Sequence, residues 1–253
     1  MTAARPRRFF VDPGTLAGDA VTLDGDLAHR LAKVLRLRPG AEIALFDGSG
    51  REATVRIERV DDRTVRARVI ERYDGPPEPR VRLHLYQSIT KGERFEWLLE
   101  KGTEIGVARF VPLVAARAVV TTKGEGNRAL RWRRIVVEAA EQCGRTAVPE
   151  IGESARFDAA LAAAPGVLLL PYEAAGDAAP SVQSALTADI DALFALNEVS
   201  VFIGPEGGFE PAEVAAAEAA GATVVTMGER VLRSETAGLV AATLVMQAVG
   251  ELG

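Results

Sequence analysis

Two short segments in the last fifth of the chain combine glycines and charged residues in an arrangement that could hold a ligand and act on it. Residues 204–208 read Gly-Pro-Glu-Gly-Gly, and residues 227–237 contain two arginines and two glutamates. Glycines lack a Cβ, so their backbone can approach a flat ligand closely. Charged side chains between a predicted buried strand and a predicted buried helix are unusual, and functional sites are one place where such side chains cluster. These segments are the first candidates for a site.

Each segment also has a purely structural explanation. Residues 204–208 could form a tight turn that leads into a helix beginning at Pro211. Ser234 could cap the last helix, while Glu235 complements its dipole and Arg233 pairs with a carboxylate. The glycines match neither G-x-G-x-x-G nor G-x-x-x-x-G-K-[ST]. This mismatch argues against ordinary dinucleotide and nucleoside triphosphate sites.

Predicted strands would bring these segments to one edge of a sheet. Buried strands are expected just before both segments, and another is expected just before Pro171-Tyr172-Glu173. In parallel α/β sheets, ligands bind at the carboxyl ends of the strands, where loops and helix N-termini converge. We therefore expect the three loops to lie together.

The second part of the chain alternates between strands and helices. Such alternation is typical of an α/β fold with a mainly parallel sheet covered by helices. By general rules of chain topology this sheet would be doubly wound and unknotted. The expected strands are residues 82–87, 110–113, 167–170, 199–203 and 223–227, and the expected helices are residues 95–105, 129–144, 211–220 and 235–249. Residues 174–198 are the least readable stretch.

The segment at residues 73–79 contains three prolines within four residues, and it predicts a linker between two domains. Before it, residues 42–46, 53–60 and 64–70 are short and rich in β-forming residues, and residues 47–50 supply a hairpin turn. One helix is expected at about residues 26–37. We therefore expect a small β-barrel over residues 1–72, a linker over residues 73–79 and an α/β domain over residues 80–253.

Charge is distributed unevenly between these two parts. The chain has a net charge of −5, yet residues 1–75 contain 14 Lys and Arg against 12 Asp and Glu. A surface that binds phosphates needs only a local positive potential, so an acidic total does not exclude a nucleic acid as partner.

The content of cysteine, histidine and apolar residues limits the remaining classes. Cys143 is the only cysteine, which fits a reducing compartment, and we expect a cytoplasmic protein without a signal peptide or a membrane-spanning segment. His29 and His84 lie far apart in the sequence with no clustered ligands, so no metal site is expected.

The segments at residues 203–209 (IGPEGGF) and 228–237 (GERVLRSETA) closely resemble the RsmE family of 16S ribosomal RNA uracil-N3 methyltransferases, members of the SPOUT superfamily. The resemblance extends over nearly the whole chain. Further landmarks are Arg8-Phe9-Phe10, His29-Arg30, Val34-Leu35-Arg36, Pro39-Gly40, Phe46-Asp47-Gly48, Lys91-Gly92-Glu93, Glu104-Ile105-Gly106-Val107, Glu141-Gln142-Cys143-Gly144-Arg145 and Val148-Pro149-Glu150-Ile151.

This resemblance implies the fold, the cofactor and the partners. It implies an N-terminal PUA-like β-barrel that binds RNA, a SPOUT domain with a trefoil knot, a homodimer, and S-adenosyl-L-methionine as the cofactor in rRNA processing. The implied cofactor-binding residues are Leu170, Pro171, Tyr172, Glu173, Ile203, Gly204, Pro205, Gly207, Met227, Gly228, Val231, Leu232, Thr236 and Ala237.

The implied reaction is the attack of uracil N3 on the methyl group of the cofactor, without a metal. Neutral uracil carries a proton on N3, so an enzyme must remove it or stabilise the resulting anion. Arg233 is the candidate cation. Glu235 and Glu206 are alternative candidates for the base or positioning group, and the sequence does not separate them.

Positive side chains around the site are expected to bind the RNA, because a target base must leave its stack to reach a recessed pocket. The alternative for such charges is an ordinary solvated surface. The candidates are Arg7, Arg8, Arg30, Lys33, Arg36, Arg131 and Arg134. Two other functions remain open: a SPOUT methyltransferase acting on a ribose hydroxyl or on tRNA, and a non-catalytic protein of ribosome assembly.

Overall fold

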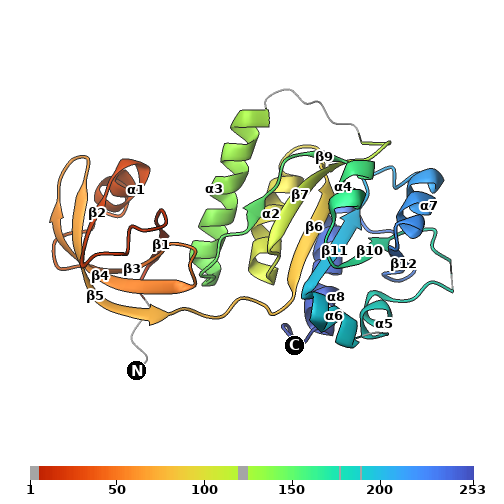
Figure 1. Cartoon of the computed structure of the whole chain (residues 1–253). Coiled ribbons are helices and arrows are strands. Elements are labelled where there is room, and N and C mark those ends of the chain that lie inside the picture. The colour runs from red at the N-terminus through yellow and green to blue at the C-terminus, as the bar shows by residue number, and fades with distance from the viewer. Residues whose placement is uncertain (1–5, 119–124, 177, 189) are drawn as a thin grey trace. The chain divides into compact units, whose positions relative to one another are not determined.

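The computed structural model describes residues 6–118, 125–176, 178–188 and 190–253, which form two compact units. The first unit comprises the chain up to Glu78 together with Ala140–Val148, and the second comprises Pro79–Ala139 and Pro149–Gly253. Both are visible in Figure 1. Each unit has its own sheet and its own buried apolar core.

The first unit is built on a five-stranded sheet in the order β1-β3-β4-β5-β2. Its strands are β1 (Arg8–Phe10), β2 (Ala20–Leu23), β3 (Glu42–Phe46), β4 (Arg51–Val60) and β5 (Val65–Asp74). Strand β1 pairs with β3 in parallel, and the other neighbours are antiparallel. Alternate apolar side chains of β4, including Val55 and Ile57, are buried in the core of this unit.

The expected helix of the first unit is shorter than predicted and changes its winding. It consists of α1 (Gly25–His29) followed by the π-helix η1 (Arg30–Val34), in which the amide of Leu35 donates to the carbonyl of Arg30 at 2.9 Å. Arg36 lies beyond the helix with a φ of 50°. Because the helix is wound with i→i+5 bonds and ends at Val34, the three-residue spacing of Arg30, Lys33 and Arg36 does not place them on one helical face.

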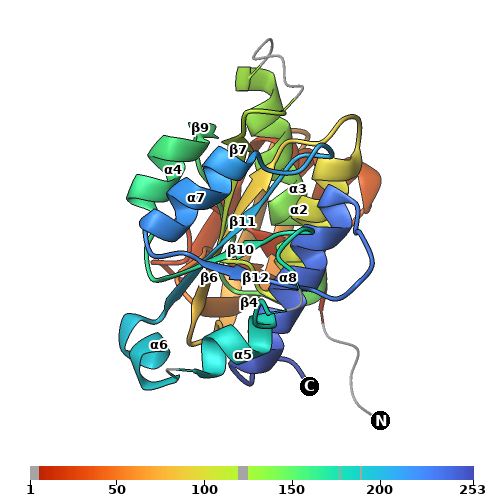
Figure 2. The same ribbon diagram turned by 90° about the vertical axis from the view of Figure 1, so that its right-hand side faces the viewer.

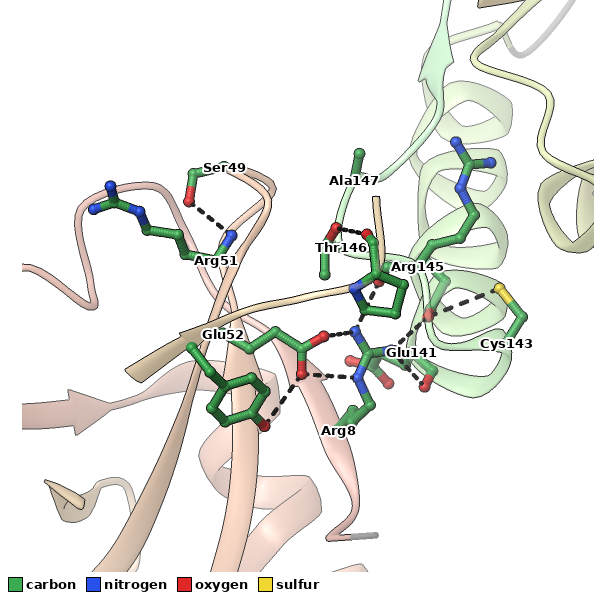
Figure 3. Close-up of polar contacts among 12 residues, drawn as sticks. Arg8, Ser49, Arg51, Glu52, Glu141, Cys143, Arg145, Thr146 and Ala147 are labelled. Atoms are coloured by element: carbon green, nitrogen blue, oxygen red, sulfur yellow. Dashed lines mark hydrogen bonds and ion pairs between the residues drawn. The ribbon is translucent and has the colours of Figure 1, made fainter. Parts of the chain in front are cut away.

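Arg8 lies at the centre of a polar network within the first unit (Figure 3). Its guanidinium forms an ion pair with the buried carboxylate of Glu52, which also accepts a hydrogen bond from the hydroxyl of Tyr73. The same guanidinium donates to the carbonyls of Ala140 at 3.1 Å and Arg145 at 2.9 Å. Arg8 therefore joins the sheet to residues that follow it in the sequence by more than 130 positions.

The segment Ala140–Val148 is tied to this unit by further contacts. One carboxylate oxygen of Glu141 accepts from the amide of Phe10 at 3.0 Å, and the other lies 2.5 Å from Nη2 of Arg30. Arg145 donates to the carboxylate of Glu78, which lies in the predicted linker. The proline-rich segment is thus held by side-chain hydrogen bonds, and β5 extends into its first residues.

The second unit contains a parallel sheet in the order β12-β10-β11-β6-β7-β8, with β9 paired to β7. All of its strand pairs are parallel, so the predicted α/β fold with a mainly parallel sheet is confirmed. The strands are β6 (Arg82–Ser88), β7 (Arg109–Val114), β8 (Glu150–Ile151), β9 (Ala155–Arg156), β10 (Val167–Pro171), β11 (Glu198–Ile203) and β12 (Thr223–Val225).

Helices cover both faces of this sheet, as Figure 2 shows. The helices from α2 onwards are α2 (Arg94–Ile105), α3 (Glu125–Cys143), α4 (Phe157–Ala163), α5 (Val182–Thr187), α6 (Ile190–Leu196), α7 (Pro211–Ala219) and α8 (Ser234–Ala248), and the last residues of α3 belong to the first unit. Helices α4 and α7 lie together on one face, where Phe157, Phe202 and Phe209 form an aromatic cluster. Helices α2 and α8 pack together on the other face. None of the helices in the described ranges is both long and apolar enough to span a membrane.

The strand order determines where the candidate loops meet. Strand β10 lies between β12 and β11, and all three run in the same direction. The loops that follow them therefore leave the sheet at the same edge. Helix α8 begins at this edge directly after the loop that follows β12.

Candidate active site

A cavity of about 270 Å³ lies at this edge, between the three loops. Its walls include Pro171, Tyr172 and Glu173 from the first loop. The second loop contributes Ile203, Gly204, Pro205, Glu206, Gly208 and Phe209, and the third contributes Met227, Gly228, Arg230, Val231, Leu232, Arg233, Ser234 and Ala237. The structure thus brings together segments that are separated by up to 66 positions in the sequence.

A buried hydrogen-bond chain holds the second and third loops together. The hydroxyl of Ser234 donates to the carbonyl of Gly204 at 2.5 Å. The side-chain amide of Gln87, at the end of β6, donates to the same hydroxyl at 2.8 Å. Gln87 and Ser234 are both buried, where an unpaired polar group would be costly. The N-cap residue of α8 is Arg233. The hydroxyl of Ser234 bonds to the second loop and does not cap the helix, which was the structural role that the sequence allowed.

The glycine-rich loop has a backbone conformation that requires glycine at Gly208. Its φ is +69°, and its amide donates to the carbonyl of Pro205 at 2.9 Å. A Cβ added at Gly208 would lie 2.2 Å from a carboxylate oxygen of Glu173, so the first and second loops approach each other closely here. Arg117 supports the turn from outside by donating to the carbonyl of Gly207 at 2.9 Å.

The turn also leads into a well-capped helix, as the structural explanation predicted. Pro211 occupies the first turn of α7, and the side chain of Glu213 accepts from the amide of Glu210 at 2.8 Å in a capping box. This cap and the cavity are compatible, because the capping residues follow the glycines that line the cavity.

One main-chain hydrogen bond joins the first loop to the end of β12, and a second bond shapes the turn of the third loop. The amide of Tyr172 donates to the carbonyl of Val225 at 3.1 Å. Gly228 has a φ of +104°, and its amide donates to the hydroxyl of Thr226 at 3.2 Å. These contacts turn the chain back towards α8 and place Arg233 at the rim of the cavity.

Two candidate catalytic groups lie in different surroundings. The guanidinium of Arg233 is exposed and has no ion-pair or hydrogen-bond partner among the described residues. Arg233 lines both the first cavity and a second one of about 630 Å³. Glu235 is 8% exposed and lines only the second cavity. Its Oε2 is buried without a hydrogen-bond partner in the described part of the chain. Such an oxygen can accept a proton or a hydrogen bond from a ligand.

Arg94, at the start of α2, lies between the two candidate carboxylates. Its guanidinium is 3.8 Å from Glu235 and 3.9 Å from Glu206, which are ion-pair distances longer than a hydrogen bond. Glu206 lines the first cavity, so Arg94 brings the two glutamates into one electrostatic group.

Most predicted cofactor-binding residues line the first cavity, with three exceptions. Leu170 in β10 and Gly207 in the second loop do not contribute to the wall of the first cavity, and Thr236 lines the second cavity. Sequence reasoning missed Gln87, Arg94 and Arg230. Gln87 could have been found as the polar residue that ends an apolar strand, whereas the contributions of Arg94 and Arg230 depend on how loops fold.

The predicted RNA-binding residues fall into two groups: Arg8, whose side chain is engaged inside the first unit, and the others, which lie at or near the surface. Arg8 is engaged by carbonyls and Glu52 inside the first unit, so it has a structural role there that differs from the predicted contact with RNA. The other residues remain at the surface or at its edge. Arg7 and Arg36 are exposed, and Arg30, Lys33, Arg131 and Arg134 pair with Glu141, Asp62, Glu96 and Glu138, respectively.

Across the described residues, no cluster of three or more His, Cys, Asp or Glu side chains could hold a metal ion. His84 is buried in β6 with Nε2 3.4 Å from a carboxylate oxygen of Glu198. Burial lowers the pKa of His84, and the nearby Glu198 opposes this shift.

Comparison with known proteins identifies the family. The profile described as an RNA methyltransferase domain matches residues 76–246, and the one described as an RNA methyltransferase PUA domain matches residues 23–70. The chain is 36% identical over 240 residues to the ribosomal RNA small subunit methyltransferase E of Mycobacterium tuberculosis, covering 92% of this chain and 88% of the mycobacterial protein. The chain belongs to the RsmE family. The Bacillus subtilis member is 30% identical over 224 residues, with 87% of each chain covered.

A solved member of the RsmE family has the same fold. The crystal structure of this enzyme from Neisseria gonorrhoeae bound to S-adenosyl methionine matches with a TM-score of 0.83 and 30% identity, covering 96% of this chain and 98% of that one. The N-terminal PUA-like domain and the C-terminal parallel α/β domain expected from the sequence are therefore confirmed.

Proposed function

We propose that this protein transfers the methyl group of S-adenosylmethionine to N3 of a uracil in 16S ribosomal RNA. The observation that carries the proposal is the cavity enclosed by the loops after β10, β11 and β12, with Arg233 at its rim. Membership of the RsmE family and the cofactor named in the Neisseria gonorrhoeae structure support this reading.

The residues of the first cavity suit the cofactor. Apolar side chains such as Ile203, Met227 and Leu232 can pack against an adenine ring, and the glycine backbone leaves room for close main-chain contacts. Glu206 on the cavity wall suits the positive charge of the cofactor. When bound, S-adenosylmethionine supplies an electrophilic methyl group.

The charged residues account for the proton and the developing charge. N3 of uracil must lose its proton as its bond to the methyl carbon forms, and S-adenosylhomocysteine leaves as the sulfur–carbon bond breaks. Glu235, whose Oε2 lacks a partner in the described chain, can accept that proton, with Glu206 as the alternative acceptor. Arg233 can stabilise the negative charge that spreads onto the uracil carbonyl oxygens.

A turnover assay on undermethylated small ribosomal subunits tests the proposal, with free 16S RNA alongside. Nucleoside mass analysis should reveal N3-methyluridine formed in the presence of S-adenosylmethionine. Formation of a 2′-O-methyl nucleoside, or of methylated tRNA, would assign the chain to another SPOUT activity. Absence of binding heat and of a thermal shift with S-adenosylmethionine would instead support a non-catalytic role in ribosome assembly.

The remaining assignments rest on the family resemblance. We propose that the protein acts in the cytoplasm as a homodimer on the small subunit, uses no metal, and has a C-terminal chain that passes through a trefoil knot. We also retain the boundaries of a PUA-like domain at residues 1–72, a linker at residues 73–79 and a SPOUT domain at residues 80–253. Sedimentation at several concentrations tests the dimer, and turnover in a chelator tests the independence from metal.

A further inference from the structure

A second cavity of about 630 Å³ lies beside the first and shares Arg233 with it. Its walls come from the loop before α2, from α2 itself and from the start of α8, and they include Lys91, Arg94, Trp97 and Glu235. This second cavity is shallower and more open to solvent than the first. The cofactor cavity alone does not explain why this second space exists.

We propose that this second cavity receives the target nucleotide of a single-stranded RNA segment, with Trp97 stacked on a base and Lys91 facing a phosphate. This inference rests on the proposed function, since it names where the substrate of that reaction binds. The first observation in its favour is that Arg233 lines both cavities. A base bound in the second cavity would therefore lie next to the cofactor in the first cavity, with the guanidinium between them.

Trp97 is an unusual side chain to leave in contact with solvent. It is 46% exposed on α2, whereas the other tryptophan, Trp132, is 5% exposed and packs against Phe95 with ring centroids 4.6 Å apart. Flat aromatic side chains on single-strand binding proteins stack on bases whatever their sequence. A uridine released from its stack would recover stacking energy on the ring of Trp97.

The charges of the cavity fit a phosphate at its mouth and a neutral base inside it. Lys91 is exposed and has no ion-pair partner among the described residues. Glu93 also lines the cavity, and Arg94 is already close to Glu206 and Glu235. Lys91 and Arg233 are therefore the cations left for the RNA backbone and for the base.

The buried oxygen of Glu235 points to a hydrogen-bond donor in the occupant. Oε2 of Glu235 has no partner within the described chain, and a buried acceptor of this kind is costly unless a ligand or water satisfies it. The N3–H group of uracil is such a donor. Uracil in the second cavity would thus lie against a wall that includes Arg233 and Glu235.

A single-tryptophan variant tests this inference directly. Trp132→Phe leaves Trp97 as the only tryptophan, and hexauridylate is titrated in the presence of S-adenosylhomocysteine. We expect saturable quenching of the fluorescence, and Lys91→Ala in this background should reduce the salt slope of binding by about 1. Lys101→Ala is the control, because Lys101 lies on α2, the helix that carries Trp97, and pairs with Glu100 and Glu104. If Trp132→Phe does not fold, the difference between the unsubstituted protein and Trp97→Phe gives the same signal.

Two substitutions of Trp97 separate stacking from simple packing. Trp97→Phe should retain most of the activity, whereas Trp97→Leu should raise the KM for RNA by about tenfold or more, since stacking on an aromatic ring is lost. The affinity for S-adenosylmethionine should remain unchanged in both. Equal KM values for the Phe and Leu variants would overturn the inference, as would fluorescence that responds to protein concentration but not to hexauridylate, because a second copy of the chain would then cover Trp97.

These outcomes are distinguishable from a failure of the proposed function. If hexauridylate quenches Trp97 but no subunit is methylated, the nucleotide site stands and the activity fails. If subunits are methylated at uracil N3 while Trp97 neither quenches nor affects KM, the activity stands and this site is wrong.

Discussion

The hydroxyl of Ser234 lies 2.5 Å from the carbonyl oxygen of Gly204, and this single contact joins two loops that are 30 positions apart in the sequence. The contact is short and partly buried. The side-chain amide of Gln87 orients the hydroxyl of Ser234 by donating a hydrogen bond to it. The shape of the first cavity therefore depends on a serine that the chain places at the first residue of α8.

Replacing Ser234 with alanine should weaken cofactor binding. The variant leaves the carbonyl of Gly204 without this donor, at a cost of about 1–3 kcal/mol, and leaves the side-chain amide of Gln87 only its longer bonds to the carbonyls of Ser88 and Ser234. We expect the Kd for S-adenosylmethionine to rise by about tenfold, which corresponds to ~1.4 kcal/mol. Calorimetric titration measures it. Thr243→Ala on the same helix is the control, because its hydroxyl bonds only to the carbonyl of Leu239. Equal affinities in the two variants would show that the bridge does not shape the cavity.

Replacing Arg233 with alanine should affect turnover far more than cofactor affinity. Removing a group that stabilises charge in the transition state typically lowers kcat by about 10²–10³. The Kd for S-adenosylmethionine should change by less than about threefold, since the guanidinium lies at the rim. Single-turnover methylation of subunits and a binding titration measure the two effects. Unchanged turnover would remove Arg233 from its role.

Adding a methyl group at Gly238 should disturb the same hydrogen-bond chain from another side. A Cβ there would lie 2.3 Å from the side-chain oxygen of Gln87 and 2.8 Å from Leu98. We expect Gly238→Ala to lower the free energy of unfolding by about 1–3 kcal/mol, as overpacking of a core does. Gly126→Ala on α3 is the matched control, since a Cβ there meets nothing within 4 Å. Urea denaturation should separate them, and similar midpoints would contradict the predicted crowding.

The sequence predicts these elements unevenly, for reasons that particular residues make clear. Strand β3 was predicted over its full range, because residues 43–46 are apolar and lie next to a clear turn. The meeting of the loops after β10, β11 and β12 follows from the rule for parallel sheets. The bridge from Ser234 does not, since a serine before a helix is usually a cap and its partner is distant in the sequence.

The winding of η1 illustrates a second kind of limit. Apolar periodicity predicts a helix around Leu31, but it does not distinguish i→i+4 from i→i+5 bonding. The π-winding moves Arg36 out of the helix and separates it from Arg30. The sequence therefore predicts that a helix is present here but not which of its charged residues share a face.

Arg8 should prove essential for the stability of the first unit. Arg8→Ala would leave the buried carboxylate of Glu52 unpaired, and breaking such a pair typically costs about 3–5 kcal/mol. Thermal unfolding should show a clear decrease in Tm. Arg56→Ala is the control, because its pair with Glu42 is exposed and such pairs contribute about 1 kcal/mol or less. Equal Tm values for the two variants would argue that water replaces the lost guanidinium.

His84 should make the stability of the second unit depend on pH. Because burial lowers the pKa of His84 from its ordinary value of 6.5, the unfolded chain binds a proton more readily than the native chain. This contribution to stability is fully present above pH 6.5 and decreases as the pH falls below it towards the lowered pKa of the native state. Urea midpoints between pH 7.5 and 5.5 should therefore fall more steeply in the unsubstituted protein than in His84→Gln, and equal slopes would contradict the prediction.

The placement of Ala140–Val148 in the first unit has a consequence for synthesis on the ribosome. The carbonyls that Arg8 binds belong to Ala140 and Arg145, so the first unit cannot complete this network when only its own strands have emerged. More than sixty further residues must be translated first. The network around Arg8 therefore stays incomplete while the first strands of the second unit are being translated. A gene fragment ending at Glu78 would encode a first unit that lacks Ala140–Val148, including the last turn of α3.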